Sequence, residues 1–419
     1  MPDEDRMQEA PTRRDCVKYG GTILGGGLLA GCRGDTDSGT NPTSTETVTR
    51  TEPTTTETET APSGDGTYSV SMAPMGEVEF EEVPQDVFTI LGHHTDMLLA
   101  LGRGDAINAM HGPGYHQALY EKLVHHLEGV SVDWEGLYSS WPPTKERLYE
   151  LNSDVHIADP AKVATADGWE NSDVREVEEN IGPWFGNTLS GTNRTPPEAW
   201  ADRYNYYTLW EILGKVAQVF REDKRYEALA SVHASMRQTI ETNLPPESER
   251  PSAALVLFSS SDEKAWGYKM NYPGYYAAHT RPMGATDALA DAVGAGYGDD
   301  GRNITLSYEL LLEADLDVLL VLGPMTEYFN LDEIRTRLEE NDVTSALTAV
   351  QEGNVYAQGA RRQGPILNLF QLEMTAKQLY PDRFGEWPGY VNGEPYPEIP
   401  EDEQLFDRQR VADVITGEF

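Results

Sequence analysis

One long segment in the middle of the chain has the pattern of a helix and divides the remaining sequence into two parts. From Trp200 to Thr242 there is no proline and a single glycine, Gly214, and Leu244-Pro245-Pro246 follows. Apolar residues recur at helical spacing in this segment. They are Leu209, Ile212, Leu213, Val216, Val219 and Phe220. The pattern predicts one long amphipathic helix, or two abutting ones, within residues 200–248.

Strand and helix patterns alternate on both sides of this segment. Before it, apolar runs at 78–83, 87–91, 106–110 and 155–158 predict strands, and stretches at 96–101, 115–126, 145–151 and 173–180 predict helices. After it, strands are expected at 253–258, 317–322 and 355–356, and helices at 286–293, 307–314, 331–351 and 366–379. Such alternation is typical of parallel α/β sheets. We therefore expect an α/β fold with two Rossmann-like lobes, at residues 68–199 and 251–380, and a C-terminal tail at 381–419.

The two lobes resemble one another in one helix-then-strand unit. The residues from Lys145 to Val155 align with those from Tyr308 to Val318. The alignment places Glu146 and Glu309 at equivalent positions in the first turn of a helix. A carboxylate is favoured there by the helix dipole and can accept paired hydrogen bonds from an arginine.

The first 67 residues lack this pattern and carry sorting signals instead. Arg13-Arg14 precedes a short Gly/Leu run, as in twin-arginine export signals, and Cys32 follows small residues, as in lipoprotein signals. The segment from Tyr19 to Gly31 is too short for a membrane-spanning helix. We therefore expect residues 1–31 to be a processed signal, Cys32 to be lipidated, and the Thr/Glu-rich residues 32–67 to form a disordered tether.

Composition narrows the possible partners and chemistry. The chain has 70 acidic and 32 basic side chains, a formal charge of -38, which excludes nucleic acid and indicates the solvated acidic surface of a halophilic protein. Its only cysteines are Cys16 and Cys32. Cleavage before Cys32 would leave no disulfide, thiolate nucleophile or cysteine metal cluster in the folded body. We expect the mature protein to be a monomer.

In the order of these elements, the chain resembles the helical-backbone (class III) substrate-binding proteins of ABC importers for iron-siderophores and cobalamin, particularly haloarchaeal ferric-siderophore binders. The resemblance rests on Ile90-Leu91-Gly92 followed by Met97-Leu98-Leu99-Ala100-Leu101-Gly102, on the repeated unit, and on Gly364-Pro365-Ile366. It implies the class III periplasmic-binding-protein fold. It also implies a protein that is lipid-anchored at the extracellular face of the cell membrane. The implied function is delivery of an iron(III)-siderophore to an ABC permease, with neither catalysis nor a cofactor. The resemblance also implies that Glu146 and Glu309 meet arginines of the permease.

The resemblance places the ligand between the lobes, at loops that follow the carboxyl ends of strands. Aromatic walls with a few cations suit a bulky anionic metal chelate, and Arg361-Arg362 precedes a helix N-terminus, which favours an anion. For any one aromatic residue, ordinary packing is the alternative. The candidates are His93, His94, Tyr138, Trp141, Trp169, Trp266, Tyr268, Tyr272, Tyr275, Tyr276, Tyr328, Arg361 and Arg362.

Other ligands and other classes of protein are weighed against this interpretation. Cobalamin, haem or an oxyanion would suit the same fold. A bare zinc or manganese ion is disfavoured, because adjacent residues such as His93 and His94 point apart on a regular element. An exported hydrolase is the alternative from another class, but the sequence lacks a G-x-S-x-G motif and a cysteine in its folded body. The two-lobed pattern also disfavours an adhesion module.

Overall fold

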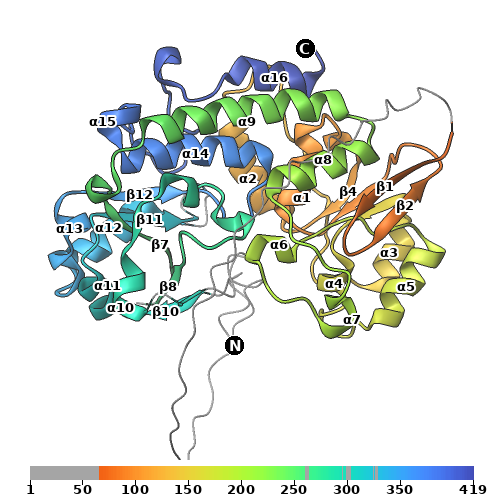
Figure 1. Cartoon of the computed structure of the whole chain (residues 1–419), viewed down its shortest axis with the longest axis horizontal. Coiled ribbons are helices and arrows are strands. Elements are labelled where there is room, and N and C mark those ends of the chain that lie inside the picture. The colour runs from red at the N-terminus through yellow and green to blue at the C-terminus, as the bar shows by residue number, and fades with distance from the viewer. Residues whose placement is uncertain (1–65, 260–263, 295, 299–302, 324, 326–328) are drawn as a thin grey trace, which may run out of the picture. The chain divides into compact units, whose positions relative to one another are not determined.

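In the computed structural model, which describes residues 66–419 except 260–263, 295, 299–302, 324 and 326–328, two helices occupy the middle of the chain. They are α8 (Leu209–Val219) and α9 (Asp223–Asn243), both green in Figure 1. Arg221 lies between them with φ 54, a left-handed conformation that ends α8. Thr208 and Glu211 form a capping box at the start of α8, so the predicted helix begins later than Trp200.

The structure describes the chain from residue 66 onward. The predicted signal, and the predicted tether up to position 65, therefore lie outside the described residues. Arg13, Arg14 and Cys32 are among the residues that are not described. Within the described part of the chain, no helix combines the length and apolar character that crossing a membrane requires.

The N-terminal lobe contains a parallel sheet of four strands in the order β5-β4-β3-β6. These strands are β3 (Val87–Thr89), β4 (Ile107–Met110), β5 (Tyr138–Ser139) and β6 (Val155–Ile157). The accompanying helices are α1 (Gly92–Ala100), α2 (Pro113–Val124), α3 (Lys145–Leu151), α4 (Pro160–Val163), α5 (Asn171–Asn180), α6 (Leu189–Thr192) and α7 (Glu198–Ala201). The strand predicted at 78–83 instead pairs outside this sheet, as β2 (Gly76–Phe80) in an antiparallel hairpin with β1 (Tyr68–Met72).

The C-terminal lobe contains a six-stranded sheet that is mixed rather than parallel. Its strand order is β10-β8-β7-β11-β12, and β9 also pairs with β7. Strands β8 (Ala265–Tyr268) and β10 (Ile304–Leu306) run antiparallel to their neighbours. The parallel strands are β7 (Ser252–Phe258), β9 (Thr286–Asp287), β11 (Val318–Leu322) and β12 (Val355–Gln358).

The helices of this lobe follow the predicted order with two differences in extent. The helix predicted at 286–293 begins at α10 (Ala288–Val293), because residues 286–287 form β9. The helix predicted at 331–351 divides into α12 (Leu331–Glu340) and α13 (Thr348–Gln351). The side chain of Asn341 accepts hydrogen bonds from the backbone N–H groups of Val343 and Thr344, which turns the chain after α12.

The predicted repeat between the lobes extends to the caps of its helices. Thr144 caps α3 by accepting from the N–H of Arg147, and Ser307 caps α11 (Tyr308–Ala314) by accepting from the N–H of Leu310. Each helix ends at a left-handed residue, Asn152 with φ 47 and Asp315 with φ 45. Both units therefore hold their helix with the same local hydrogen bonds.

An aspartate before the following strand is also shared. Asp154 accepts hydrogen bonds from the backbone N–H groups of Gln85 and Asp86, just before β3. Asp317 accepts from the backbone N–H of Ser252, at the start of β7. Each aspartate therefore fixes the start of the neighbouring strand, β3 beside β6 and β7 beside β11.

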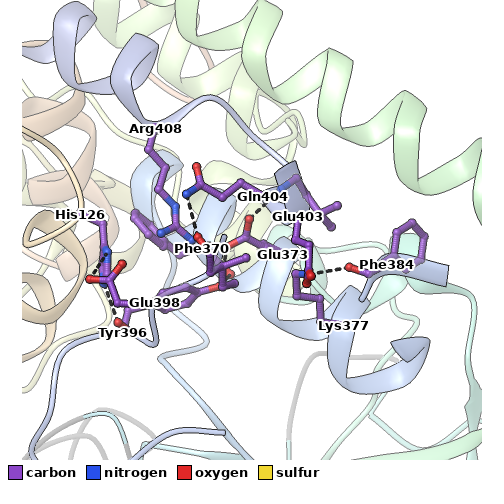
Figure 2. Close-up of polar contacts among 12 residues, drawn as sticks. His126, Phe370, Glu373, Lys377, Phe384, Tyr396, Glu398, Glu403, Gln404 and Arg408 are labelled. Carbon is purple, nitrogen blue, oxygen red and sulfur yellow. Dashed lines mark hydrogen bonds and ion pairs between the residues drawn. The ribbon is translucent and has the colours of Figure 1, made fainter. Parts of the chain in front are cut away.

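Residues 381–419, predicted as a tail, fold against the rest of the protein. They include α15 (Pro381–Phe384) and α16 (Arg408–Thr416). Figure 2 shows Glu373 of the buried helix α14 (Pro365–Leu379) among side chains of this segment. Its carboxylate accepts from Arg408 at 2.7 Å, from the Tyr396 hydroxyl at 2.9 Å and from the N–H of Leu405 at 2.7 Å. Because the ion pair is buried, removing either partner would leave an uncompensated charge.

Candidate functional site

Two segments from different lobes meet where α1 begins. The hydroxyl of Tyr275 lies 2.9 Å from Nε2 of His93, which stands in the first turn of α1 directly after β3. The hydroxyl of Tyr272 donates to the carbonyl oxygen of Gly191 in α6 at 2.8 Å. Gly274 lies so close that a Cβ atom there would collide with the same carbonyl oxygen. The lobes are therefore in direct contact at these residues.

Histidines form the N-terminal side of this contact. His93 and His94 come from α1, His116 comes from the first turn of α2, and His111 follows β4. The rings of His93 and His94 have centroids 4.0 Å apart, and those of His111 and His116 are 6.1 Å apart. All four side chains are buried. Because β3 and β4 are parallel neighbours, their carboxyl ends bring the histidines together.

Burial favours the uncharged forms of three of these imidazoles, those of His93, His94 and His116. It lowers the pKa of His94 and of His116 to about 3, and that of His93 well below its ordinary value. For His93, the neighbouring His94, Arg362 and His116 lower the pKa further. Both ring nitrogens of His94, and Nδ1 of His93 and His116, have no hydrogen-bond partner among the described residues. Each such buried group costs the fold about 1–3 kcal/mol.

Tyrosines and arginines form the C-terminal side. The guanidinium of Arg361 lies 3.9 Å from the ring centroid of Tyr268 and donates to the Tyr272 hydroxyl at 3.3 Å. Arg362 acts electrostatically on His93, His116 and Tyr275, and both arginines are over nine-tenths buried. We call this group of residues the seam; it comprises His93, His94, His111, His116, Tyr268, Tyr272, Tyr275, Tyr276, Arg361 and Arg362.

Four predicted site residues are held by contacts within their own lobes. Trp169 is buried in the N-terminal core, where its indole N–H donates to the carbonyl of Pro143 at 2.8 Å. Tyr138 and Trp141 pack against the same core. Trp266 lies in β8, opposite Leu257 of β7 and Thr305 of β10. Tyr328 lies outside the described residues. The structure thus brings together the remaining candidates, which are all in the seam.

His111, His116 and Gln363 also lie at this contact, although they are not among the residues predicted from the sequence. The amide nitrogen of Gln363 donates to the carbonyl of Tyr276 at 3.2 Å and lies 2.7 Å from Nδ1 of His279. Gln363 therefore connects the loop before α14 to the segment that contains Tyr275 and Tyr276. The position of His111 and His116 in the sequence could have revealed them, because they follow a predicted strand of the first lobe just as His93 and His94 do.

Glu146 and Glu309 occupy the same place in the two repeated units. Each is exposed, and each lies in the first turn of its helix, α3 or α11. Within the described part of the chain, neither carboxylate makes an ion pair. Both are therefore available on the surface.

Two surface cavities of the described chain lie away from the seam. One, of about 220 Å³, is in the N-terminal lobe and includes Trp184, Trp200, Arg175 and Arg203 in its lining. The other is lined by residues of α2 together with Gly393 and Pro395 of the C-terminal segment. The seam itself is closed in this structure, since its side chains are buried against one another.

Comparisons with known proteins agree with this architecture. Residues 162–361 match a family model described as "Periplasmic binding protein". A periplasmic binding protein from Veillonella parvula is 14% identical, with a TM-score of 0.51, and the match covers 75% of this chain and 92% of that one. The iron uptake ABC transporter substrate-binding protein PiuA from Streptococcus pneumoniae is 15% identical, with a TM-score of 0.50 and coverage of 76% and 99%. The sequence has no match among curated proteins.

The fold is therefore that of the class III periplasmic binding proteins, as predicted from the sequence. At these identities the likeness concerns the fold alone.

Proposed function

We propose that this protein is the substrate-binding component of an ABC importer and that it captures an iron(III)-siderophore in the seam. The observation that carries the proposal is the burial of two adjacent arginines with four tyrosines where the lobes meet. Cations beside aromatic faces bind a bulky anionic chelate through charge, hydrogen bonds and stacking. The similarity to PiuA, the substrate-binding protein of an iron uptake ABC transporter, supports the same class of ligand. The proposal is for a binding protein rather than an enzyme.

Titration of the purified protein with ferric siderophores, cobalamin, haem and molybdate, followed by tryptophan fluorescence in high salt, tests the ligand class. We expect saturable binding of at least one ferric siderophore. Binding of cobalamin or molybdate without any iron chelate would contradict the proposal.

The permease is the second partner, and we propose that Glu146 and Glu309 contact it. Their equivalent, exposed positions on two lobes would let one permease dimer engage both through arginines. Charge reversal of both residues should abolish uptake by cells and leave the affinity for the chelate unchanged. Unchanged uptake by the double variant would exclude this contact.

For the N-terminal region, we propose export by the twin-arginine route and lipid attachment at Cys32. The tether of residues 32–67 would then keep the folded body near its permease at the extracellular face of the membrane. Replacement of Cys32 by alanine should release the protein from the membrane fraction. Retention of this variant in washed membranes would exclude the lipid anchor.

A further inference from the structure

The seam presents buried imidazole nitrogens that have no hydrogen-bond partner among the described residues. His94 is only 1% exposed, yet neither of its ring nitrogens makes a hydrogen bond within the described residues. Nδ1 of His93 and of His116 are in the same position. Folded proteins rarely leave such groups unsatisfied, so their concentration at one place indicates a ligand that bears hydrogen-bonding oxygens.

Two buried carboxylates of the N-terminal lobe, Asp96 and Asp159, make their hydrogen bonds to groups other than these imidazoles. Asp96, on α1, accepts from the Tyr120 hydroxyl at 2.6 Å and from the N–H groups of Ile366 and Leu367 at 2.9 and 3.0 Å. Burial raises the pKa of Asp96 to about 6, against the lowering effect of these hydrogen bonds. It faces α14 rather than the imidazoles.

Asp159, which follows β6, is likewise engaged within the N-terminal lobe. It accepts from the Tyr204 hydroxyl at 2.6 Å and from the N–H groups of Ala161 and Thr188 at 2.9 and 2.8 Å. His93 instead has the hydroxyl of Tyr275 at 2.9 Å from its Nε2, and burial together with the groups His94, Arg362 and His116 lowers its pKa. The seam is therefore built to face negative charge.

We propose that the seam takes a carboxylate-bearing, anionic ferric chelate in preference to an uncharged one, and that His93, His94 and His116 take up protons as it binds. This inference rests on the proposed function and names its substrate class. Each imidazole lone pair accepts a proton from solvent, and no bond of the chelate or the protein breaks.

The physical reason is that each imidazole must be uncharged in the closed seam and protonated beside the bound anion. In the closed seam, burial disfavours the charged imidazolium forms, and neighbouring imidazolium ions beside Arg362 would also repel one another, so the neutral forms are favoured. An anion placed among them reverses this preference and supplies acceptors for the N–H groups. The protein, whose formal charge is -38, thus gains positive charge at the site only when the anion is present. Multimolar salt screens the surface but screens buried pairs much less.

Isothermal titration calorimetry of the full chain provides the test. Ferric citrate, prepared with excess citrate, and ferrichrome, an uncharged trihydroxamate, are titrated in multimolar KCl. Each titration is repeated in two buffers of different ionisation enthalpy, which reports the protons taken up. We expect ferric citrate to bind more tightly than ferrichrome, with net proton uptake at pH 7. Its affinity should rise as pH falls from 8 to 6, by about tenfold per pH unit for each proton taken up.

Variants assign the protons to the seam. His94→Gln and His116→Gln should each reduce proton uptake and flatten the pH dependence of affinity. His125→Gln changes an exposed histidine at the end of α2 and serves as the matched control, with both quantities unchanged. The measurements on the unaltered chain stand by themselves if a seam variant does not fold.

The outcomes separate this inference from the proposed function. Tighter binding of ferrichrome, or binding of ferric citrate without proton uptake, would overturn the inference and leave the siderophore-binding function standing. Binding of neither chelate, nor of any other ferric siderophore, would overturn both.

Discussion

The two lobes share a scaffold and differ in the chemistry that they bring to the seam. In both, a capped helix with an exposed glutamate leads into a strand, and an aspartate fixes the start of the neighbouring strand. At the seam, the N-terminal lobe contributes histidines and the C-terminal lobe contributes tyrosines and arginines. The repeated part thus carries the shared architecture and the two exposed glutamates, while loops outside the repeat supply the side chains of the seam.

The largest effect on stability is expected where one lobe is bonded to the other. Asp96→Ala removes the acceptor for the Tyr120 hydroxyl and for the N–H groups of Ile366 and Leu367, all of them buried. We expect the free energy of unfolding in urea to fall by about 4 kcal/mol, because each orphaned buried donor costs about 1–3 kcal/mol. Asp105→Ala, at an exposed acid in the same lobe, should change it by less than about 0.5 kcal/mol. Equal effects would show that Asp96 does not join the lobes.

A smaller effect is expected at the closest approach of the lobes. In Gly274→Ala, the new Cβ meets the backbone carbonyl of Gly191 and the ring of Tyr272. Since a backbone atom cannot give way cheaply, we expect a loss of about 1–3 kcal/mol in urea unfolding. Faster hydrogen exchange at α6 should accompany it. Gly104→Ala, which makes only an ordinary van der Waals contact, is the control. Unchanged hydrogen exchange at α6 would show that the close contact between Gly274 and Gly191 does not stabilise the seam.

The shared scaffold predicts equal and smaller effects in the two lobes. Asp154→Ala and Asp317→Ala leave backbone N–H groups at the start of a strand without their carboxylate, those of Gln85 and Asp86 in one lobe and that of Ser252 in the other. Because both sites are exposed and water can replace the acceptor, each should lower the free energy of unfolding by about 1 kcal/mol. Chemical denaturation of both variants measures this directly. A clear effect in one lobe and none in the other would show that the repeat is limited to backbone geometry.

Much of this fold could be predicted from local sequence patterns. The helix-then-strand unit can be recognised in the sequence because Leu148 and Leu311 recur at the same position in the two segments, and both are buried in the structure. The predicted site residues that meet in the seam follow strands or precede α14, positions that the α/β arrangement makes adjacent. These features depend on short-range periodicity and on the geometry of parallel strands.

The remainder depends on contacts between distant residues. The break between α8 and α9 falls at Arg221, whose left-handed conformation has no local signature. Trp169 resembled a ligand residue because it follows a strand, but its surroundings in the N-terminal core are formed by residues far apart in sequence. The C-terminal segment, predicted as a tail, is held by contacts with a distant helix: Glu373 of α14 accepts from Arg408 and from the N–H of Leu405, and apolar side chains of the segment such as Phe406 are buried.

The central claim is that the chelate binds between the lobes, and two arginine pairs test it most directly. Arg361 and Arg362 lie in the seam, whereas Arg175 and Arg203 line the surface cavity of the N-terminal lobe. Calorimetry with the ferric siderophore that the unaltered protein binds most tightly compares the two double alanine variants. A double lysine variant of the seam pair, together with thermal unfolding, serves to check the fold.

We predict that the seam variant loses at least about 100-fold in affinity, since two charge-assisted hydrogen bonds contribute about 3 kcal/mol or more. The cavity variant should bind as the unaltered protein does. Retained affinity in a folded seam variant, with loss in the cavity variant, would contradict the account.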